Sequence, residues 1–445
     1  MKKGIVLIAG AMLFIACAGP QVQVKKAEPM PVVKKVVTQL PTASPTDTPP
    51  KVSGTINLLT ALQLALQYNP QLTVFSLEIR AREAAALQAS FLPNPEVGVE
   101  VENFAGGGPL SGFQATETTT SLGQLIELAG KRRKRTQAAN LQTELAGFDF
   151  EAKRLEVYAQ VVSAFYNVLW IQQQVKLNQE ILQLTKEFRD QVAHRVATGR
   201  TSPAELSRAE VEVANAQVAL DQSLSQLKAA RQQLAATWGA RQATFDSVAG
   251  NFESIMAIPD YDALLAALQN NPDWTRWNTE RRFQQAQLSL AKSFRIPDPT
   301  VMAGYRRINE LNQQAFVAGV SIPLNIFNRN QGNIQQAQVR LKQVAYLESF
   351  TKVQLQTQLS TLYQNISGVH QSIVALKDKI IPQAQEAYET IVQGYHLGKF
   401  TFLDVLDARR SLFEARQTYL QNLAIFHQLR AEIERLTGKS LEDFE

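Results

Sequence analysis

The sequence repeats one order of segments, and this repetition limits the possible folds more than any other feature. Residues 61–70 (ALQLALQYNP) resemble residues 263–272 (ALLAALQNNP), and several single residues recur at an offset of about 199 positions. The pairs at this offset are Gly199 and Gly398, Glu205 and Asp404, Ala209 and Ala408, Ala216 and Ala415, and Gly239 and Gly438. Such self-similarity is typical of a duplicated structural unit. We therefore predict two structural repeats, over residues 54–250 and 251–445.

Each repeat is predicted to begin with a helix that leads into a pair of strands. The first helix covers about residues 57–90 and ends before Pro93, because proline lacks an N–H donor and disfavours helical geometry in its predecessor. Val97, Val99 and Val101 then alternate with glycine and glutamate, which is the period of a strand with two different faces. The predicted strands cover about residues 96–104, 113–128, 300–308 and 315–322.

Each strand pair is followed by a helical stretch of unusual length. These stretches cover about residues 132–198 and 331–397, and at 1.5 Å per residue each would extend roughly 100 Å. Pro382 should kink the second stretch or interrupt its backbone hydrogen bonds. The helices that follow, from Leu206 and from Val405, place apolar or small residues at steps of three and four. This spacing predicts the seam of a coiled coil, and therefore two long helical hairpins.

The turns that end the two long helices are specified residue by residue. Gly199 can adopt the left-handed conformation that ends a helix, while Ser202 can cap the next helix and Pro203 suits its first turn. Glu205 completes the sequence pattern of a capping box. The same design recurs with Gly398, Thr401 and Asp404. The hairpin tips are therefore predicted at about residues 198–203 and 397–402.

The first residues have the pattern of an export signal. A basic start precedes an apolar stretch over residues 4–16, which at about 13 residues is too short to span a bilayer as a helix. Cys17 is the only cysteine in the sequence, and its setting resembles a bacterial lipoprotein cleavage site. We predict a signal peptide over residues 1–16, lipidation of Cys17 and a proline-rich tether over residues 17–53. A chance cysteine in an ordinary signal peptide is the alternative.

No later segment is long and apolar enough to be a membrane-spanning helix. A chain that crosses a membrane without one must do so as strands of a closed barrel, because every backbone polar group in lipid needs a partner. Four strands per chain are too few to close such a barrel, so several chains must contribute. The expected fold class is mainly α with membrane β, made of long antiparallel coiled-coil hairpins and four strands per chain.

From Asn57 to Gly438 the sequence resembles the TolC-type outer-membrane efflux family. The resemblance rests on the duplicated Asn-Pro helix and on residues 92–95 (LPNP), 124–132 (QLIELAGKR) and 403–408 (LDVLDA). It implies a homotrimer whose chains close a twelve-stranded barrel in the outer membrane, with the helices forming a hollow periplasmic cylinder. It also implies a passive duct that takes small molecules or metal ions from an inner-membrane pump and a periplasmic adaptor (membrane fusion) protein to the exterior. The lipoprotein pattern favours members that serve resistance-nodulation-division pumps.

The resemblance also implies a gate at the hairpin tips. Asp404 and Asp407 match the aspartates around the periplasmic aperture of the family, and threefold symmetry would gather six carboxylates around one axis. The alternatives are a helix cap for Asp404 and a solvated helix face for Asp407. Tyr395 and Glu205 match positions that hold the closed tip together. Phe400 stands where relatives can carry an arginine that pairs across the tip, and the neighbouring Lys399 could substitute for that arginine.

The charge pattern argues against nucleic-acid binding. The formal net charge is only +5 over 445 residues. This is too small for the whole protein to present the strongly basic surface that nucleic-acid binding requires. The basic run at residues 131–135 lies where a membrane strand would become a periplasmic helix. Contact with lipid phosphate groups, or simple solvation, is therefore favoured over contact with nucleic acid.

The sequence also lacks the patterns of an enzyme. There is no nucleophile with an adjacent base, and the four histidines show no spacing that suits zinc. We therefore predict no enzymatic activity, no cofactor and no bound metal. The alternative functions are a type I protein secretion duct, a lipid-tethered periplasmic coiled-coil scaffold without a pore, and a periplasmic enzyme on a helical framework.

Overall fold

The computed structural model describes residues 49–444. The predicted signal peptide, Cys17 and nearly all of the predicted tether lie outside the described residues. The described chain divides into two compact units. The first unit consists of Glu83–Thr143 and Ala286–Ile334, and the second consists of residues 49–82, 144–285 and 335–444. Helices that contribute residues to both units are α3 (Pro70–Ser90), α4 (Lys131–Ala197), α7 (Pro272–Ser293) and α8 (Gln331–Ala375).

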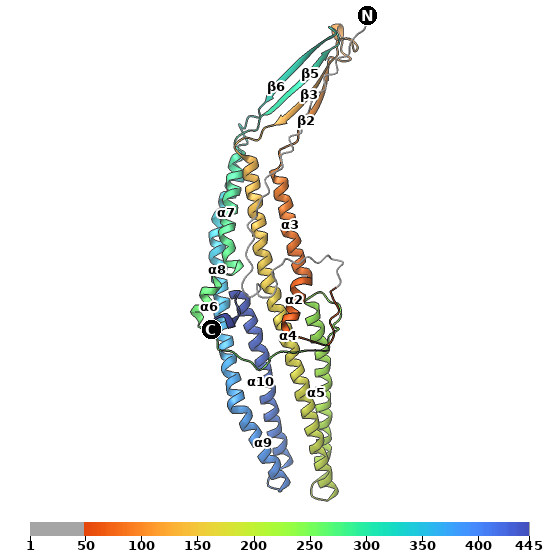
Figure 1. Cartoon of the computed structure of the whole chain (residues 1–445), viewed down its shortest axis with the longest axis vertical. Helices are drawn as coiled ribbons and strands as arrows, with labels where there is room; N and C mark the ends of the chain where they lie inside the picture. Colours follow the sequence, from red (N-terminus) through yellow and green to blue (C-terminus); the bar gives the residue numbers. More distant parts are fainter. Residues whose placement is uncertain (1–48, 445) are drawn as a thin grey trace. The chain divides into compact units, whose positions relative to one another are not determined.

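The first unit contains a four-stranded antiparallel sheet in the order β2-β3-β5-β6 (Figure 1). Its strands are β2 (Glu96–Glu102), β3 (Glu117–Leu125), β5 (Thr300–Ile308) and β6 (Gln313–Ser321). Across the sheet, Val99 lies opposite Thr120, Thr120 opposite Tyr305, and Tyr305 opposite Phe316. Strands β2 and β6 are therefore the edges of the sheet, and among the described residues each pairs with only one strand.

Apolar side chains on the edge strands are largely exposed in the single chain. Phe316 on β6 is 91% exposed, and Val97 and Val99 on β2 are 74% and 66% exposed. Water is a poor environment for such a row of side chains, and contiguous exposed apolar surface usually marks an interaction site. The sheet therefore presents both unpaired backbone edges and apolar surface that the single chain does not cover.

Two strands are shorter than the sequence predicts. The strand predicted over residues 113–128 starts only at Glu117, because a turn hydrogen bond to the carbonyl of Phe113 precedes it, and it ends at Leu125. The strand predicted over residues 96–104 stops before Asn103, whose φ is 56°. Positive φ interrupts extended geometry, and it is sterically uncommon outside glycine and asparagine.

The second unit contains two helical hairpins. Helix α4 pairs with α5 (Pro203–Ala236), and α9 (Ile381–His396) pairs with α10 (Phe402–Thr437) (Figure 1). Near their tips the two hairpins share one apolar cluster, to which every one of these four helices contributes. The buried members of this cluster are Phe188, Val192, Ala209, Tyr395, Phe402 and Val405. The hairpins are thus packed against each other, and neither is an isolated coiled coil.

A larger apolar core lies where the hairpins meet the shorter elements of the same unit. It includes Phe165 on α4, Phe426 on α10 and Trp238 just after α5, all of them 2% exposed or less. The shorter elements are β1 (Thr55–Ile56), α2 (Leu58–Tyr68), β4 (Ser247–Val248), α6 (Tyr261–Leu268) and the C-terminal turn Leu441–Phe444. Strands β1 and β4 form a small parallel pair. Among the described residues, no helix has the length and apolar character needed to cross a membrane.

The helix predicted over residues 57–90 is wrong as a single helix, because it breaks into α2 and α3 at Asn69. The Asn69 Oδ1 accepts hydrogen bonds from two backbone N–H groups of the next turn, at 2.8 and 3.2 Å, so it caps a new helix. Its Nδ2 donates to the carbonyl of Thr237 at 2.7 Å. Asn271 repeats this arrangement, and its Nδ2 donates to the carbonyl of Leu436 at 2.8 Å. Each Asn-Pro pair thus ties a new helix to the end of a hairpin.

The two long helices differ in continuity. Helix α4 is unbroken from Lys131 to Ala197, whereas the stretch after β6 contains a π-helical segment, Leu376–Ile380, between α8 and α9. The N–H of Ile381 donates to the carbonyl of Leu376, five residues back, immediately before Pro382. Proline cannot donate a helical hydrogen bond, so the ladder is rearranged beside it. The predicted interruption at Pro382 is therefore confirmed.

Candidate functional site

The two hairpin tips end their first helices with the same backbone turn. Gly199 and Gly398 have φ values of 69° and 74°, in the left-handed region that favours glycine. In each tip the N–H of the residue after the glycine donates at 2.8 Å to a carbonyl five residues earlier, that of Arg195 or of Gly394. This closing bond satisfies a carbonyl that the helix end would otherwise leave free.

The helices that leave the tips are capped in different ways. At the second tip, Thr401 Oγ1 accepts from the N–H of Asp404 at 3.2 Å, and Asp404 Oδ2 accepts from the N–H of Thr401 at 2.7 Å. This capping box lowers the pKa of Asp404, first through the backbone hydrogen bond. At the first tip, Ser202 Oγ accepts from the N–H of Ala204 at 3.2 Å. The capping box predicted with Glu205 is not formed there.

Glu205 is instead bonded across the two hairpins. The Tyr395 hydroxyl donates to Glu205 Oε2 at 3.3 Å, and Tyr395 is only 3% exposed. Burial, and then the Glu205 carboxylate, raise the pKa of Tyr395. Arg195 completes the contact, because its guanidinium lies 4.4 Å from the centre of the Tyr395 ring and its Nη1 donates to the Tyr395 carbonyl at 2.8 Å. The structure therefore brings Tyr395 and Glu205 together.

Phe400 takes part in the second tip by packing and not by charge. Its ring lies over Gly394, where an added Cβ would stand 2.7 Å from Phe400 Cε2. A side chain at residue 394 would force the Phe400 ring to move. Lys399 is exposed, and within the described part of the chain no ion pair joins it to a carboxylate.

Asp404 and Asp407 lie on consecutive positions of one face at the start of α10. The Asp404 carboxylate also accepts from the Thr401 hydroxyl at 2.8 Å, so its contacts are those of a helix cap. Asp407 is exposed. Within the described residues, no hydrogen bond or ion pair links either carboxylate to the Tyr395 and Glu205 pair. In one chain, therefore, the two predicted aperture residues and the two predicted latch residues form separate groups.

Arg409 is a further residue that holds the hairpins together, and sequence reasoning missed it. It is 7% exposed, and its Nη1 and Nη2 donate to Thr185 Oγ1 at 3.1 Å on α4 and to Glu212 Oε2 at 2.5 Å on α5. Burial lowers its pKa, although the Glu212 carboxylate opposes that change. The sequence signal was its position in an apolar series, four residues after Val405 and three before Leu412.

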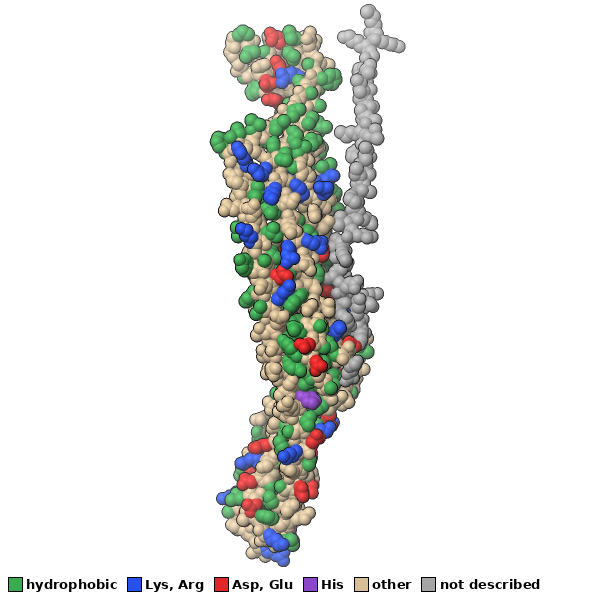
Figure 2. Space-filling model, turned by 90° about the vertical axis from the view of Figure 1, so that its left-hand side faces the viewer, with side chains coloured by type: hydrophobic (Ala, Val, Ile, Leu, Met, Phe, Trp, Pro, Cys, Tyr) green, Lys and Arg blue, Asp and Glu red, His purple; other side chains and the backbone are tan. Residues whose placement is uncertain are grey.

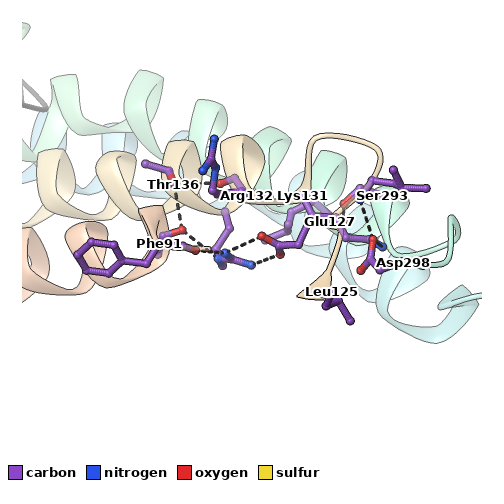
Figure 3. A network of polar contacts seen from close by, with 12 residues as sticks. Phe91, Leu125, Glu127, Lys131, Arg132, Thr136, Ser293 and Asp298 are labelled. Carbon is purple, nitrogen blue, oxygen red and sulfur yellow. Dashed lines mark hydrogen bonds and ion pairs between the residues drawn. The ribbon is translucent and has the colours of Figure 1, made fainter. Parts of the chain in front are cut away.

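A second polar network lies at the strand–helix junction of the first unit, which we define as residues 126–135, 291–299 and 322–334 (Figure 3). Arg135 forms a two-pronged ion pair with Glu127 at 2.6 and 3.2 Å. Lys131 Nζ lies 2.6 Å from Asp298 Oδ1, and its side chain is only 3% exposed. Part of the basic run predicted to meet lipid or solvent is therefore used inside the unit.

The histidines do not form a metal site. Among the described residues, no three side chains of the types His, Cys, Asp and Glu are grouped so as to hold a metal ion. His427 is fully buried, stacks on Tyr166 with 3.8 Å between ring centres, and contacts the Phe252 carbonyl through Nε2 at 2.9 Å. Burial lowers its pKa to about 4, so it is neutral near pH 7. Its contacts are those of a core residue.

The chain combines a four-stranded antiparallel sheet with two long helical hairpins whose tips are in contact. The family model for outer membrane efflux proteins matches residues 61–240 and 263–439, and the chain belongs to this family. It is an outer-membrane protein with a large periplasmic part.

Individual proteins of known name are similar to this chain over much of its length. The chain is 34% identical to the cobalt-zinc-cadmium resistance protein CzcC of Cupriavidus metallidurans, over 88% of this chain and 92% of that protein. It is 26% identical to the nickel-cobalt-cadmium resistance protein NccC of Alcaligenes xylosoxydans xylosoxydans, over 63% of each. The crystal structure of the outer membrane protein VceC from Vibrio cholerae has the same fold, with a TM-score of 0.71 at 20% identity, covering 86% of this chain and 96% of that chain.

Proposed function

We propose that this chain is the outer-membrane channel of a tripartite efflux system, and that its cargo is divalent transition-metal ions. The observation that carries the proposal is the 34% identity to a cobalt-zinc-cadmium resistance protein over nearly the full length of both chains. The second relative is named for resistance to an overlapping set of metals. The channel is passive, and an inner-membrane pump of the resistance-nodulation-division class supplies the energy through a periplasmic adaptor.

The working form proposed is a homotrimer in which three sheets close one twelve-stranded barrel. Two features of the single chain support this assembly. The edge strands β2 and β6 have unpaired backbone groups, which a neighbouring chain can pair. Exposed apolar side chains such as Val97 and Phe316 suit contact with lipid. The duplicated Asn-Pro caps and glycine turns support the proposal that the chain arose from two structural repeats.

The N-terminus is proposed to be anchored by lipid. Cys17 would be the lipidated first residue of the mature chain, and residues 17–53 would connect it to the folded part. One acyl chain gives only weak membrane attachment, whereas the several chains of a lipoprotein add their contributions. Mass spectrometry of the mature N-terminal peptide tests this assignment, because a lipidated cysteine has a characteristic mass, whereas cleavage at another residue would contradict it.

The hairpin tips are proposed to form the periplasmic gate. Tyr395 and Glu205 hold the two hairpins of one chain together at rest, and the adaptor would open the aperture by moving the second hairpin. Three copies of Asp404 and Asp407 would surround the aperture. Carboxylates gathered in this way attract cations, and repel one another more strongly as the aperture narrows.

Metal export can be tested in cells. The chain is expressed in a strain that retains a matching pump and adaptor but lacks its own outer-membrane channel, and growth is measured against rising zinc, cobalt and cadmium. Restored resistance to these ions, but not to an organic drug, is the expected result. Resistance to the drug alone would assign the channel to another cargo.

The channel itself can be tested with the purified protein in planar bilayers. A trimeric duct gives discrete single-channel currents, whereas a coiled-coil scaffold without a pore gives none. In the double variant Asp404→Ala with Asp407→Ala, block by added divalent cations should weaken and conductance should change. Unchanged block would remove these carboxylates from the aperture, and the control Glu210→Ala alters an exposed acid on α5 instead.

A further inference from the structure

The strand–helix junction holds more basic side chains than its own acids can neutralise. Its acidic residues are Glu127 and Asp298, and these are already paired with Arg135 and Lys131. The remaining basic residues of the junction are Arg132, Arg133, Lys134, Lys292, Arg295 and Arg329. Within the described residues, no ion pair joins any of these six to a carboxylate. All of them are exposed except Lys134, which is half-buried.

Two long helices add to the positive potential of the same region. Helix α4 begins at Lys131 and helix α8 begins at Gln331, and neither has an acidic residue in its first turn. The N-terminus of a helix carries a partial positive charge, which basic side chains do not complement. Arg132 and Arg133 therefore lie in the first turn of α4 where an anion would be stabilised. Within the described residues, the positive charge of the junction is therefore not neutralised by carboxylates of the same chain.

Exposed apolar side chains lie among these basic residues. Phe327 is 91% exposed and Leu324 76%, and on the facing segment Ile296 is 47% exposed. Figure 2 shows hydrophobic side chains gathered where the strands end, with Lys and Arg side chains next to them over the helices. A free phosphate ion would leave the apolar side chains in water. An amphiphilic anion would cover both kinds of side chain at once.

We infer that the strand–helix junction binds the headgroups of anionic phospholipids in the periplasmic leaflet of the outer membrane. The headgroup phosphates accept hydrogen bonds from arginines such as Arg132 and Arg329, while the acyl chains cover Phe327 and Leu324. Lys131 and Arg135 have another role, because their ion pairs brace the segments that present the exposed residues. The inference rests on the proposed function, since it requires the strands to lie in the membrane.

The test measures lipid retention by the purified full chain. The protein is reconstituted with equal parts of phosphatidylethanolamine and cardiolipin, extracted into mild detergent, and analysed by native mass spectrometry. We expect cardiolipin to be retained about tenfold over phosphatidylethanolamine, because each basic side chain near the surface adds to anionic-lipid attraction. Excess inorganic phosphate should not displace it. Equal retention of both lipids, or displacement by phosphate, would overturn the inference.

A pair of variants locates the binding. The junction variant combines Arg132→Gln, Arg133→Gln, Arg295→Gln and Arg329→Gln, all exposed and none in the ion-paired network. The control variant makes the same charge change at four exposed residues of the second unit: Lys176→Gln, Arg208→Gln, Lys228→Gln and Arg241→Gln. Only the junction variant should lose the cardiolipin preference, and equal loss in both variants would contradict the assignment.

A separate readout keeps the inference distinct from the proposed channel. Both variants and the native protein are placed in planar bilayers of phosphatidylethanolamine alone, where no anionic lipid is present. Currents in all three, together with the selective loss of cardiolipin in the junction variant, support both proposals. Absence of current in the native protein would defeat the channel, whereas currents without any cardiolipin preference would defeat only the lipid site.

Discussion

The two hairpin tips share a backbone turn but use the acid at the same position differently. In the second tip Asp404 caps its own helix, through hydrogen bonds to and from Thr401. In the first tip Glu205 accepts from the hydroxyl of Tyr395, which belongs to the other hairpin. The side chain is one methylene longer in Glu205, which lets it reach beyond its own helix. The acid of the second tip therefore caps its own helix, whereas the acid of the first tip is bonded to the other hairpin.

This difference has a consequence for opening. The cap of the second tip is formed within its own helix, by Thr401 and Asp404. Its hydrogen bonds therefore stay intact when the two hairpins separate. When the second hairpin moves away from the first, the hydrogen bonds of Tyr395 with Glu205 and with Arg195 both break. Arg409 holds the hairpins together deeper in the bundle, through Thr185 and Glu212. We expect the long hydrogen bond between Tyr395 and Glu205 to oppose separation less than the ion pair of the buried Arg409 does.

The largest effect is expected from Arg409→Met, which removes the hydrogen bonds from Arg409 to Thr185 and Glu212. It leaves Glu212 without its partner, and we expect a loss of roughly 2 kcal/mol in stability, less than for a fully buried pair because Glu212 is a third exposed. Thermal unfolding followed by circular dichroism measures this loss. Arg410→Met is the matched control, since Arg410 is exposed on the same helix. Equal effects of both would show that Arg409 does not hold the hairpins together.

A smaller effect is expected from Tyr395→Phe, which removes only the hydroxyl that donates to Glu205. The hydrogen bond is long, so the loss should be about 0.5 kcal/mol, with more frequent opening of the tip in single-channel records. Glu205→Gln keeps an acceptor and should have less effect. If tip opening were the same in Tyr395→Phe and the native protein, the cross-hairpin contact would not be a latch.

The same contact predicts a pH dependence with a definite sign. The pKa of Tyr395 is raised above its ordinary value, so the neutral hydroxyl stabilises the folded tip. That stabilisation is fully present below about pH 10 and is lost as the pH rises through the raised value. Opening should therefore increase at strongly alkaline pH in the native protein. A similar increase in Tyr395→Phe would assign the effect to another group.

Asp404→Ala tests the internal cap of the second tip. Its expected effect is local, with faster hydrogen exchange at the first turn of α10 and little change at the start of α5. The pKa of Asp404 is lowered by Thr401, so the cap persists above the ordinary carboxyl pKa and is lost as the pH falls through the lowered value. Exchange in acid should approach that of the variant. An acid-insensitive turn would contradict the capping role.

The smallest effect is expected from Glu205→Asp, which gives the first tip the acid of the second. The shorter side chain can complete a capping box with Ser202 but loses its reach to Tyr395. Stability should hardly change, because one hydrogen bond replaces another, while tip opening should increase as in Tyr395→Phe. Hydrogen exchange at the start of α5 and single-channel records separate the two consequences. Unchanged opening would mean that side-chain length does not account for the difference between the tips.

Much of the fold could be predicted from the sequence, because the signals are local. Positive φ at Gly199 and Gly398, the cap at Thr401 and the interruption at Pro382 each depend on residues within one or two turns. The break at Asn69 is an exception, because the prediction of one helix over residues 57–90 places the Asn-Pro pair in a helix interior although its signal is local. Its capping hydrogen bonds reach only to the next turn.

The partners of the charged side chains could not be predicted in the same way. The basic run at residues 131–135 is uniform in sequence, yet Lys131 and Arg135 are used inside the unit while Arg132 and Arg133 are exposed. The helix places successive residues on different faces, and only the neighbouring segments decide which face is covered. The acid that Lys131 meets, Asp298, comes from the other half of the chain.

The sequence alone determined the glycine turns of the two hairpins, the cap at Thr401 and the interruption at Pro382, and the resemblance it carries pointed to the family. Those features follow from backbone geometry and nearest neighbours, which act over a few residues. The tertiary structure decided that Glu205 faces Tyr395, that Arg409 lies between the hairpins, and which basic residues form no ion pair within residues 49–444. The reason is physical: an ion pair or hydrogen bond forms only between side chains that packing brings within about 3 Å, however far apart they lie in the sequence.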